Sequence, residues 1–554
     1  MPTLVQVGAG NIGRGFIAPT FAAAGWRVVF IDVAPAVLAA LAERGGYRVL
    51  LVDGEQETVQ TVTGVSGVNG RDLEAAATAI AGADLVATSV GLGALPHAAP
   101  ALAEGLRRRP VDRPLDILVC ENGAQAHTVL RDLILARLPE SERAAADRRL
   151  GCVRTSIGRM IPPERSGDPL DIRVEPYAKL PVERAAFRGP VPVVPNLYAK
   201  DDFDRVLAEK LYLHNLTHAC LAYAGHLRGC ATIPDCMQHA DLVAEVDQVA
   251  QEVALAFSRK WGEDAGAEAR MIAADLFHRY RNRALSDPVA RVARDPWRKL
   301  AADDRLVGAA RLCLDQGIRP RAICRAIGLA LLYTPASDEP RAAEWLALSP
   351  SARLSAAAGL TPEDPIMAAS TYHAQLASRR AAAAQAMRAA GLVLRDDEAA
   401  AIEIADFGLD RYAEYGLAIH VYVNTDRCCA KELVMTPGQI CPEHRHPPVD
   451  GDPGKEETFR VRQGEVFLYL PGHKQDGAEK AAALARVPAD KHAAHTMYKC
   501  VHLKPGEQYT LKPNTPHWFV AGPQGAIVSE FSTKSRDEVD VFTDTAIVRV
   551  PPAA

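Results

Sequence analysis

The stretch from Lys210 to His218 combines residue types that could oxidise an alcohol. On a helix, Lys210, His214 and His218 recur at i, i+4 and i+8, so they share one face, with Asn215 at its edge. A desolvated lysine can lose its proton and then accept one from a hydroxyl group, while an amide or an imidazole can hold or polarise a substrate oxygen. An amphipathic helix whose polar face meets water gives the same pattern. The stretch therefore needs support from the rest of the chain.

A second set of residues, much later in the chain, suits a divalent transition metal. His444 and His446 are two apart, so in a strand they point to the same face. Glu457 follows across a turn, and His517 comes later. Three imidazoles and one carboxylate, with positions left for water or substrate, suit such an ion. Glu456 is the neighbouring alternative to Glu457, and strand alternation places the two on opposite faces.

Lys431 and Glu530 are suited to proton transfer beside that metal. Lys431 precedes the histidine pair by one hairpin, and Glu530 ends an apolar run. A metal that binds adjacent sugar oxygens acidifies the C–H bond between them, and a lysine or a glutamate can move that proton. For both residues, an exposed charge at a strand end is the ordinary alternative.

The elements that come first in the chain predict a dinucleotide-binding domain. An apolar strand pattern at 4–7 leads into Gly8-Ala9-Gly10-Asn11-Ile12-Gly13, a helix follows to about Ala24, and a second strand pattern ends at Asp32. Such glycines allow a pyrophosphate to approach a helix N-terminus, and the acidic residue accepts hydrogen bonds from a ribose. The residues expected to contact NAD are Gly8, Gly10, Asn11, Ile12, Gly13 and Asp32.

Alternation of apolar runs with helical segments continues beyond this point and predicts a doubly wound parallel sheet. The runs at 84–89 and 116–120 are its next strands. Asn122 follows the second run, and ligands gather beyond the carboxyl ends of parallel strands, so its amide could reach the reacting oxygen. An asparagine before Gly123 is equally typical of a plain turn.

The pattern changes twice further along the chain. Residues 160–200 are rich in proline and predict an irregular crossover, and from 202 to about 390 the pattern is almost wholly helical. Beyond 405, short strand patterns separated by turns predict a β-sandwich or barrel. Among them, 458–461 and 466–470 are expected as two strands joined at a turn. We expect an α/β Rossmann domain at 1–195, an all-α domain at 196–380 and a β domain at 381–554.

Composition narrows the classes of function. The chain has 554 residues, 48% hydrophobic and 24% charged, with a formal net charge of −5 and neither a basic nor an acidic tail. We expect small-molecule substrates and neither nucleic acid nor a membrane as partner. The eleven cysteines lack a CxxC pair, and a strand pattern begins at once, which favours reduced thiols in the cytoplasm. A homodimer through the last domain is the assembly we expect.

With these motifs in place, residues 1 to about 378 resemble mannitol-1-phosphate 5-dehydrogenase and its relatives among the polyol-specific long-chain dehydrogenases. The matching stretches are Gly8-Ala9-Gly10-Asn11-Ile12-Gly13-Arg14-Gly15-Phe16-Ile17, Cys120-Glu121-Asn122, Arg159-Met160-Ile161-Pro162-Pro163, Lys210 to His218, Arg298-Lys299-Leu300 and Asp304-Arg305-Leu306. The resemblance implies that Lys210 is the general base, that Asn122 and Asn215 polarise the alkoxide, and that His218 orients the substrate.

Two departures from that family's pattern weigh against a phosphorylated substrate. Gly123-Ala124-Gln125 follow Asn122 where mannitol-phosphate enzymes tend to carry bulkier and basic residues. Arg283 follows Asn282 where those enzymes tend to have proline.

Residues from about 388 to 546 resemble the cupin D-lyxose ketol-isomerases, which implies a β-barrel of the cupin type. The matching stretches are Tyr422-Val423-Asn424-Thr425-Asp426-Arg427, Lys431-Glu432-Leu433, Pro442-Glu443-His444-Arg445-His446-Pro447-Pro448, Gly454-Lys455-Glu456-Glu457-Thr458-Phe459-Arg460, Asn514-Thr515-Pro516-His517-Trp518-Phe519 and Phe542-Thr543-Asp544. The resemblance implies His444, His446, Glu457 and His517 as ligands to manganese, with Lys431 and Glu530 as the proton-transfer pair.

These resemblances imply a bifunctional enzyme. The front part oxidises a polyol of the D-arabinitol or D-mannitol type to a ketose with NAD, and the back part interconverts D-lyxose with D-xylulose or D-mannose with D-fructose. Two alternatives stay open. One is an enzyme pair that acts on phosphorylated sugars with fructose 6-phosphate as the shared metabolite. The other is a dehydrogenase whose cupin domain only binds sugar.

Asp32 predicts a preference for NAD over NADP. Its carboxylate would repel the 2′-phosphate of NADP, and no arginine follows it directly. The wild-type protein is expected to show a higher kcat/KM with NAD than with NADP, and Asp32→Ala is expected to erode the difference. Equal catalytic efficiency of the wild type with both cofactors would contradict the assignment.

Overall fold

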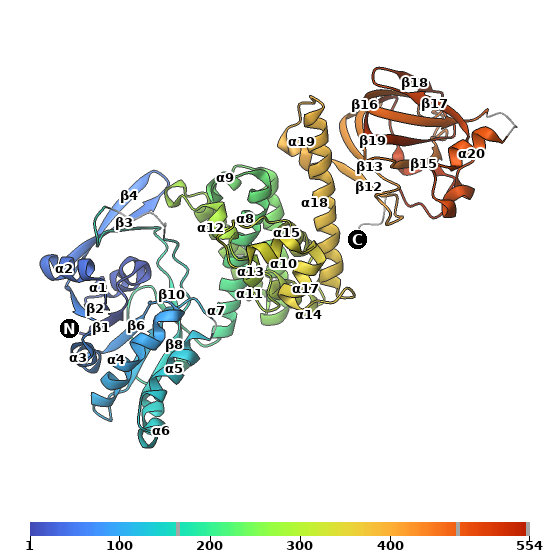
Figure 1. Cartoon of the computed structure of the whole chain (residues 1–554). Helices are drawn as coiled ribbons and strands as arrows, with labels where there is room; N and C mark the ends of the chain where they lie inside the picture. Colours follow the sequence, from blue (N-terminus) through green and yellow to red (C-terminus); the bar gives the residue numbers. More distant parts are fainter. Residues whose placement is uncertain (124, 162–166, 473–476, 550–554) are drawn as a thin grey trace. The chain divides into compact units, whose positions relative to one another are not determined.

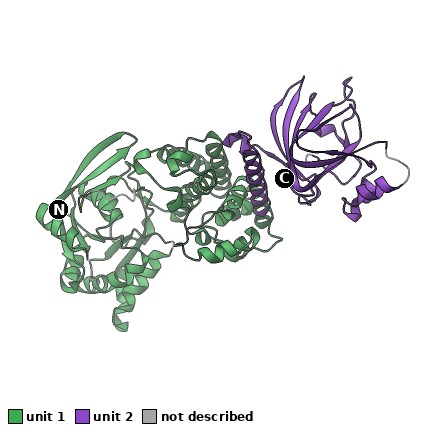
Figure 2. Ribbon diagram, turned by 45° about the horizontal axis from the view of Figure 1, so that its top comes forward, with its two compact units in different colours: residues 1–370 green, residues 371–554 purple. Residues whose placement is uncertain are grey.

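The computed structural model describes residues 1–123, 125–161, 167–472 and 477–549. The chain divides into two compact units, Met1–Ser370 and Thr371–Ala554 (Figure 2). The expected boundary at 380 falls inside one continuous helix, α18 (Pro365–Ala389), whereas the units divide at 370. The reason is that the second half of α18 packs on the β unit, as described below.

A parallel sheet in the order β5-β2-β1-β6-β7-β8 organises the start of the chain (Figure 1). The strands are β1 (Thr3–Val7), β2 (Arg27–Asp32), β5 (Val65–Asn69), β6 (Leu85–Thr88), β7 (Leu115–Val119) and β8 (Leu150–Arg154). The intervening helices are α1 (Ala18–Ala22), α2 (Pro35–Arg44), α3 (Leu73–Gly82), α4 (Leu95–Arg108), α5 (Ala126–Ala136) and α6 (Glu140–Arg149). The expected Rossmann architecture is confirmed.

Alternating side chains of this sheet enter two separate cores, one on each face. Leu4, Val28 and Phe30 belong to the core shared with α1 and α2. Their neighbours Val5 and Val29 belong to the core shared with α3, α4 and α5. Because both faces are covered, the strands are apolar at nearly every position, as buried parallel strands are.

Residues 160–200 are more regular than expected. Strand β9 (Ile172–Val174) joins the hairpin of β3 (Gly46–Asp53) and β4 (Gln56–Thr63), and β10 (Leu180–Glu183) pairs with β11 (Leu197–Lys200). The proline signals in this stretch do not exclude short edge pairings, which need few backbone donors. Pro162 and Pro163 of the matching motif lie outside the described residues.

The helical part of the first unit surrounds α8, which continues directly from a π-helical turn, η4. The elements are α7 (Phe203–Glu209), η4 (Lys210–Asn215), α8 (Leu216–Arg228), α9 (Ile233–Cys236), α10 (Ala240–Trp261), α11 (Glu263–Tyr280), α12 (Val289–Ala293), α13 (Pro296–Lys299), α14 (Val307–Asp315), α15 (Arg321–Leu331), α16 (Ala342–Ala347) and α17 (Pro350–Ala358). Asp202 caps α7 by accepting from the backbone N–H of Arg205 at 3.1 Å, and Gly229 ends α8 with a positive φ of 75°. Helix α8 packs against α10, α12 and α15, which explains why most of its residues are buried.

The second unit is a curled, mainly antiparallel sheet around one apolar core. Its strands are β12 (Glu403–Ala405), β13 (Leu417–Asn424), β14 (Cys429–Met435), β15 (Ile440–Arg445), β16 (Glu457–Leu470), β17 (Lys499–Leu503), β18 (Gln508–Leu511), β19 (His517–Ser532) and β20 (Val541–Phe542). The order is β12-β13-β14-β19-β15-β20, and β16 pairs with β17, β18 and β19. This arrangement agrees with the expected cupin-like β domain.

The two strands expected at 458–461 and 466–470 form one bent strand, β16. Register shifts between Val461 and Gln463 and between Gly464 and Val466 take up the turn signal as β-bulges against β19. A Cβ atom on Gly464 would lie 2.0 Å from the carbonyl oxygen of Gly525, so this close approach of two backbones requires glycine. The expectation of a turn was wrong because bulges and turns use the same residues.

The second half of α18 covers part of the outer face of the curled sheet. Ala383, Ala384 and Met387 share a buried cluster with Ala418, Val434 and Ile527 of the strands. The Arg380 side chain donates to the carbonyl oxygen of Ile402 at 2.8 Å. The alanines in this half of α18 therefore form a surface with which the helix packs on the sheet.

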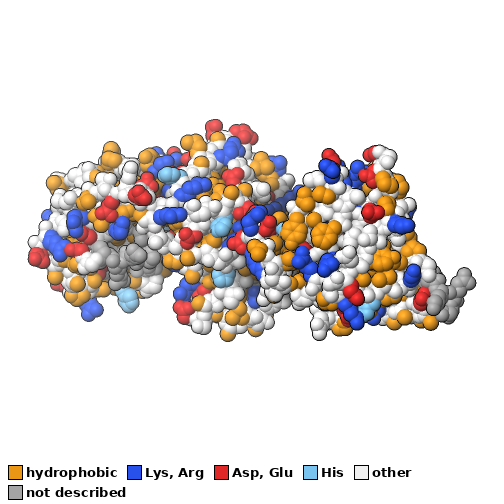
Figure 3. Space-filling view, turned by 90° about the horizontal axis from the view of Figure 1, so that it is seen from above, with side chains coloured by type: hydrophobic (Ala, Val, Ile, Leu, Met, Phe, Trp, Pro, Cys, Tyr) orange, Lys and Arg blue, Asp and Glu red, His pale blue; other side chains and the backbone are white. Residues whose placement is uncertain are grey.

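The surface carries charged side chains of both signs dispersed over the face seen in Figure 3. Within the described ranges, no helix is both long enough and apolar enough to cross a membrane.

Two candidate active sites

The glycine turn after β1 has room for a dinucleotide on one side only. Gly8 has φ of 94°, and a Cβ atom on Gly13 would lie 2.2 Å from the carbonyl oxygen of Gly8. The two ends of the turn are therefore in close contact and leave no room for a side chain at Gly13. A Cβ atom on Gly10 would meet nothing within 4 Å, and Gly10 and Asn11 are exposed. Ile12 is half-buried beside them. The open side presents backbone N–H groups at a helix N-terminus, which fits a pyrophosphate.

Asp32 lies against this turn, at the end of β2. Its carboxylate accepts hydrogen bonds from the backbone N–H groups of Ala9, at 2.6 Å, and Ala34, at 2.9 Å. A carboxylate has four lone-pair positions, so it retains acceptor capacity for ribose hydroxyl groups. The sequence expectation for the loop and Asp32 thus has the geometry that NAD binding requires.

Lys210, His214 and His218 lie together, as their spacing predicted. The Lys210 Nζ atom is 2.9 Å from His214 Nδ1. The His218 ring stacks on Tyr280 with ring centres 5.1 Å apart, and its Nε2 lies 3.0 Å from Asp287 Oδ2. The turn that carries Lys210 is π-helical, and single π turns are frequent at functional sites. No sequence pattern predicted the π turn, and none predicted Asp287 and Tyr280 as partners of His218.

Burial gives Lys210 the properties of a base. Burial, and secondarily the positive charge of Arg279, lowers the pKa of Lys210 to about 7. The negative charge of Glu175 acts in the opposite direction. A lysine with a pKa near neutrality is substantially unprotonated at pH 7 and can accept a proton from a hydroxyl group.

Arg279 and Glu175 form a buried ion pair that the sequence analysis missed. Arg279 Nη2 is 2.5 Å from Glu175 Oε1, and the side chains are 9% and 1% exposed. Arg279 also donates to the carbonyl oxygen of Gly158, and Arg159 donates to that of Gly15 at 2.8 Å. Arg279 thus connects the segment after β8 to α11, whose last residue is Tyr280. Arg159 connects the same segment to the helix that follows the glycine turn.

The two asparagines expected to polarise the alkoxide are less tightly placed. Asn215 is half-buried at the end of η4, next to His214. Asn122 is exposed after β7, and within the described part of the chain no hydrogen bond or ion pair holds its side chain. Of the residues that follow, Ala124 lies outside the described residues. The structure thus brings Lys210, Asn215 and His218 together on one stretch and leaves Asn122 on a separate loop.

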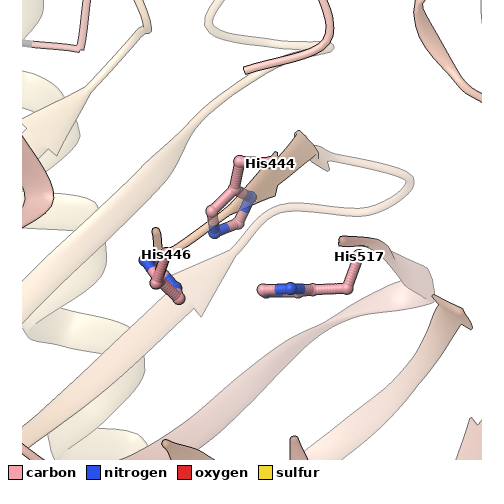
Figure 4. Close-up of side chains that lie close together, drawn as sticks. All are labelled: His444, His446 and His517. Carbon is pink, nitrogen blue, oxygen red and sulfur yellow. The ribbon is translucent and has the colours of Figure 1, made fainter. Parts of the chain in front are cut away.

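The three histidines expected in the second unit converge (Figure 4). One nitrogen from each of His444, His446 and His517 lies within 4.8 Å of the others, and all three side chains are buried. Glu457 Oε1 is 3.1 Å from both His446 Nε2 and His517 Nε2. The expected ligand set is therefore assembled from β15, the residue after it, β16 and β19.

Hydrogen bonds on the far side of each ring fix these imidazoles. His444 Nδ1 lies 2.8 Å from the carbonyl oxygen of Pro442, and His517 Nδ1 lies 3.0 Å from that of Thr515. His446 Nδ1 is 2.5 Å from Asp540 Oδ1. Such outer partners orient ligand histidines with Nε2 free for the ion.

The donor set fits a divalent metal. Within the described residues, the buried His517 Nε2 atom makes no hydrogen bond of standard geometry, although Glu457 Oε1 lies 3.1 Å away, and burial, with the neighbouring His517, lowers the pKa of His444 well below its usual value. Burial raises the pKa of Glu457, but Lys455 and His446 outweigh it and keep this carboxyl ionised. Ligands must be unprotonated, as the His444 ring and the Glu457 carboxylate are. Burial lowers the pKa of His446, but Glu457 and Asp540 outweigh it and raise that pKa to about 9, so this ring must release a proton when a metal binds.

Lys455 is a residue of this pocket that the sequence analysis did not select. Its Nζ lies 2.7 Å from Glu457 Oε2 and 2.6 Å from Glu530 Oε1, at 6% side-chain exposure. Burial lowers its pKa, but Glu457 and Glu530 raise it well above the usual value. Lys455 therefore stays charged. Lys455 lies two residues before Glu457, just ahead of the start of β16.

Lys431 and Glu530 face each other across β14 and β19, as register partners, and both are buried. Lys431 Nζ donates to Ser535 at 2.8 Å and to Asp537 at 2.9 Å. Burial lowers its pKa, but Glu530 and Asp537 outweigh that effect, so the pKa is raised. The alternative left open for both residues, an exposed charge at a strand end, is therefore wrong. The ammonium group in direct contact with Glu530 is that of Lys455.

The pocket is completed by residues near the end of the chain. Arg549 Nη2 lies 3.0 Å from Asp537 Oδ2, and the Arg549 side chain also pairs with Glu403 at 2.5 Å. The lining includes Lys431, His444, His446, Lys455, Glu457, Glu530, Asp537, Asp540, Phe542 and Arg549. A small polar molecule entering this pocket would meet both charged lysines and the histidine cluster.

Comparisons with known proteins divide the chain in the same way. Residues 2–196 match the family model of the mannitol dehydrogenase Rossmann domain, and residues 202–389 that of the mannitol dehydrogenase C-terminal domain. Residues 384–553 match the D-lyxose isomerase family model.

Individual relatives are similar to one part or the other. A mannitol-1-phosphate 5-dehydrogenase of Bacillus licheniformis is 38% identical over 346 residues, which are 61% of this chain and 90% of the relative. A D-lyxose/D-mannose isomerase of Thermosediminibacter oceani is 53% identical over 167 residues, 30% of this chain and 90% of the relative. Among solved structures, the ternary complex of Pseudomonas fluorescens mannitol 2-dehydrogenase with NAD and D-mannitol shares the fold, with a TM-score of 0.53 and 16% identity over 68% of this chain and 91% of that chain.

The pKa of Lys210 predicts how alcohol oxidation depends on pH. A base acts in its unprotonated form, so kcat/KM for oxidation is expected to rise with pH through about 7 and then level off. Reduction of the carbonyl product uses the protonated form, so its rate is expected to fall through the same range. The measurement is the initial rate of NADH formation or consumption over a pH series. A pH-independent rate of oxidation across this range would contradict the role of Lys210.

Proposed function

Because the chain belongs to the mannitol dehydrogenase family in its first part and to the D-lyxose isomerase family in its last part, we propose that it oxidises a polyol to a ketose with NAD and interconverts that ketose with an aldose. The first pair of reactions is D-arabinitol to D-xylulose and D-xylulose to D-lyxose. The second is D-mannitol to D-fructose and D-fructose to D-mannose. The observation that carries the proposal is the presence of two side-chain clusters in one chain, one around Lys210 and one around His446.

In the first unit, Lys210 accepts the proton of the substrate hydroxyl group while hydride leaves the same carbon. NAD, held by the glycine turn and Asp32, supplies the hydride acceptor. Asn215 and Asn122 donate hydrogen bonds to the oxygen as its negative charge develops. His218 orients the substrate, and Asp287, 3.0 Å from His218 Nε2, fixes the orientation of that ring. The proton ends on Lys210 Nζ, so charge is balanced.

In the second unit, His444, His446, Glu457 and His517 would hold a divalent metal, and manganese suits this mixed nitrogen and oxygen set. When bound, the ion acidifies the C–H bond next to a sugar carbonyl. Glu530 then moves the proton between the two carbons of the ketose and the aldose. Lys455 and Lys431 remain ammonium groups. They donate hydrogen bonds to the sugar oxygens on which negative charge develops.

A shared ketose is the economical reason for joining the two activities. A dehydrogenase of the first family forms a ketose from a polyol, and an isomerase of the second converts a ketose. Joining the sites raises the local concentration of this intermediate, by an amount that depends on the reach of the connection. The free cysteines of the described residues also fit a reducing compartment, and we propose the cytoplasm. A homodimer formed through the second unit remains the assembly we expect.

A phosphorylated substrate is the second candidate. The similarity to mannitol-1-phosphate 5-dehydrogenases over 90% of their length favours it. Gly123 and Arg283, where such enzymes tend to carry other residues, weigh against it, so free polyols rank first. A second unit that only binds sugar ranks lower, because the buried pair of Lys455 and Glu530 beside the histidines is not needed for binding alone.

Loss of activity at one site is expected to leave the activity of the other site intact. Lys210→Met removes the base and is expected to lower polyol oxidation on the order of 10²- to 10⁴-fold while leaving isomerisation intact. A chelator, or His446→Ala, is expected to abolish isomerisation and spare NADH formation. Both rates are measured on the intact chain, with each variant serving as the control for the other. If chelation abolished NADH formation as strongly as isomerisation, the metal would not belong to the second unit alone.

The two sites are also expected to use the same ketose. A screen of free and phosphorylated polyols for NADH formation identifies the best polyol. Its ketose is then given, with manganese, to the intact Lys210→Met variant, and the aldose is measured. Conversion at a rate comparable to that of the best sugar is the expected result. If that ketose is not converted, the two sites do not share an intermediate, even if polyol oxidation and isomerisation are both observed.

A further inference from the structure

His214 lies within hydrogen-bond distance of the amine of Lys210, and the proposed reaction gives it no role. Its Nδ1 atom lies 2.9 Å from Lys210 Nζ, and the residue is 7% exposed. Both residues belong to the π turn η4. At that distance one of the two nitrogens donates a hydrogen bond to the other.

Tyr280 contacts both the backbone and the ring of His214. The backbone carbonyl oxygen of His214 accepts a hydrogen bond from the Tyr280 hydroxyl group at 2.9 Å, and that hydroxyl group is 3.0 Å from Thr217 Oγ1. The rings of His214 and Tyr280 meet edge to face with centres 6.4 Å apart. Lys210, by contrast, carries its amine on a flexible stem of four carbons. A hydrogen bond from the Lys210 amine to His214 Nδ1 can limit the positions that this flexible side chain takes.

We propose that His214 is a positioning residue for Lys210: its Nδ1 accepts a hydrogen bond from the Lys210 amino group and holds that group where it meets the substrate hydroxyl proton. The inference rests on the proposed polyol oxidation and adds to it a residue that acts through Lys210. His214 takes no proton itself. The hydroxyl proton moves to Lys210 Nζ, and the bond to His214 strengthens as the amine becomes an ammonium group.

The charges around His214 favour the neutral ring that this role requires. Burial, then Lys210 itself, lowers its pKa well below the usual value. The other groups that act on it are Arg279 of α11, His218 of α8 and Arg305 before α14, and each lowers the pKa as well. A neutral imidazole can accept from the ammonium form of Lys210 without adding a like charge, because Nδ1 then carries a lone pair.

The choice of histidine at this position is itself informative. The neighbours Leu213 and Leu216 are fully buried, so an aliphatic side chain would suit the burial of position 214 equally well. Burying a polar ring costs free energy unless it forms a hydrogen bond. The hydrogen bond of this ring that faces the reacting region is the one to Lys210.

The experiment compares His214→Leu with His214→Asn in the intact chain. Leucine removes the acceptor, whereas the amide oxygen of asparagine is as many bonds from Cβ as Nδ1 is and can replace it. We expect His214→Leu to lower kcat for polyol oxidation about 10- to 100-fold, the worth of a hydrogen bond to a charged group. We also expect the rise of kcat/KM with pH to begin at lower pH, because the lost acceptor stabilised the ammonium form. His214→Asn is expected to recover most of the rate and the wild-type pH profile.

His226→Leu is the matched control. His226 lies on α8, the helix that continues from η4, packs its ring on Tyr333 with centres 4.7 Å apart and has no place in the proposed site. Its substitution is expected to leave kcat and the pH profile unchanged. Isomerase activity and the thermal unfolding of each variant show whether the chain is folded.

Three outcomes would overturn the role of His214. They are full activity of His214→Leu, an unchanged pH profile in an impaired His214→Leu, and an Asn variant no better than the Leu variant. If the wild type oxidised no polyol, the proposed function would fail instead. The inference would then be decided by acetic anhydride labelling of Lys210 over a pH series, read by peptide mass spectrometry. The half-labelling pH is expected to fall in His214→Leu and to be kept in His214→Asn, and no change in His214→Leu would overturn the inference.

Discussion

Burial of ionisable side chains is the constraint on which both candidate sites depend. A charge removed from water is unfavourable unless it is neutralised, paired or hydrogen-bonded. In the first unit, the amine of Lys210 is buried beside a neutral imidazole and beside Arg279, which is itself paired with Glu175. In the second unit, Lys455 is buried between Glu457 and Glu530. Each candidate site therefore contains a buried lysine whose protonation depends on the groups beside it.

The same residue type therefore has opposite properties in the two units. Lys210 has no carboxylate in direct contact among the described residues, so burial dominates and its pKa falls. Lys431 and Lys455 are less exposed than Lys210, but carboxylates of Asp537, Glu530 and Glu457 lie within hydrogen-bond distance of them, and their pKa values rise. One lysine can act as a base, and the other two can act as fixed positive charges. The difference comes from the carboxylates of neighbouring strands.

Periodicity and glycine patterns were sufficient for the fold classes and for most of the candidate residues. The Rossmann sheet, the helical layer and the shared face of His444 and His446 follow from local sequence, since strand alternation and turn residues are local signals. The partners supplied by distant segments could not be predicted. Asp287 at His218, Asp540 at His446 and Arg549 at Asp537 meet only through tertiary packing. The π turn at Lys210 and the bulges of β16 also have no distinctive sequence signal, because they use ordinary residues.

Because helix α18 belongs to both parts of the protein, the fused gene is difficult to divide into two. Its first half carries Ile366 and Met367, which are buried, and its second half carries Met387, which is buried on the curled sheet. A gene can be divided within the segment that encodes a flexible linker without loss of packing in either product. A division within a helix that both parts share removes packing from at least one of them. A split of the gene inside α18 would shorten a helix whose apolar positions both products bury. Fission would therefore expose apolar side chains in one or both proteins, and selection for stable, soluble products would keep the fused gene intact.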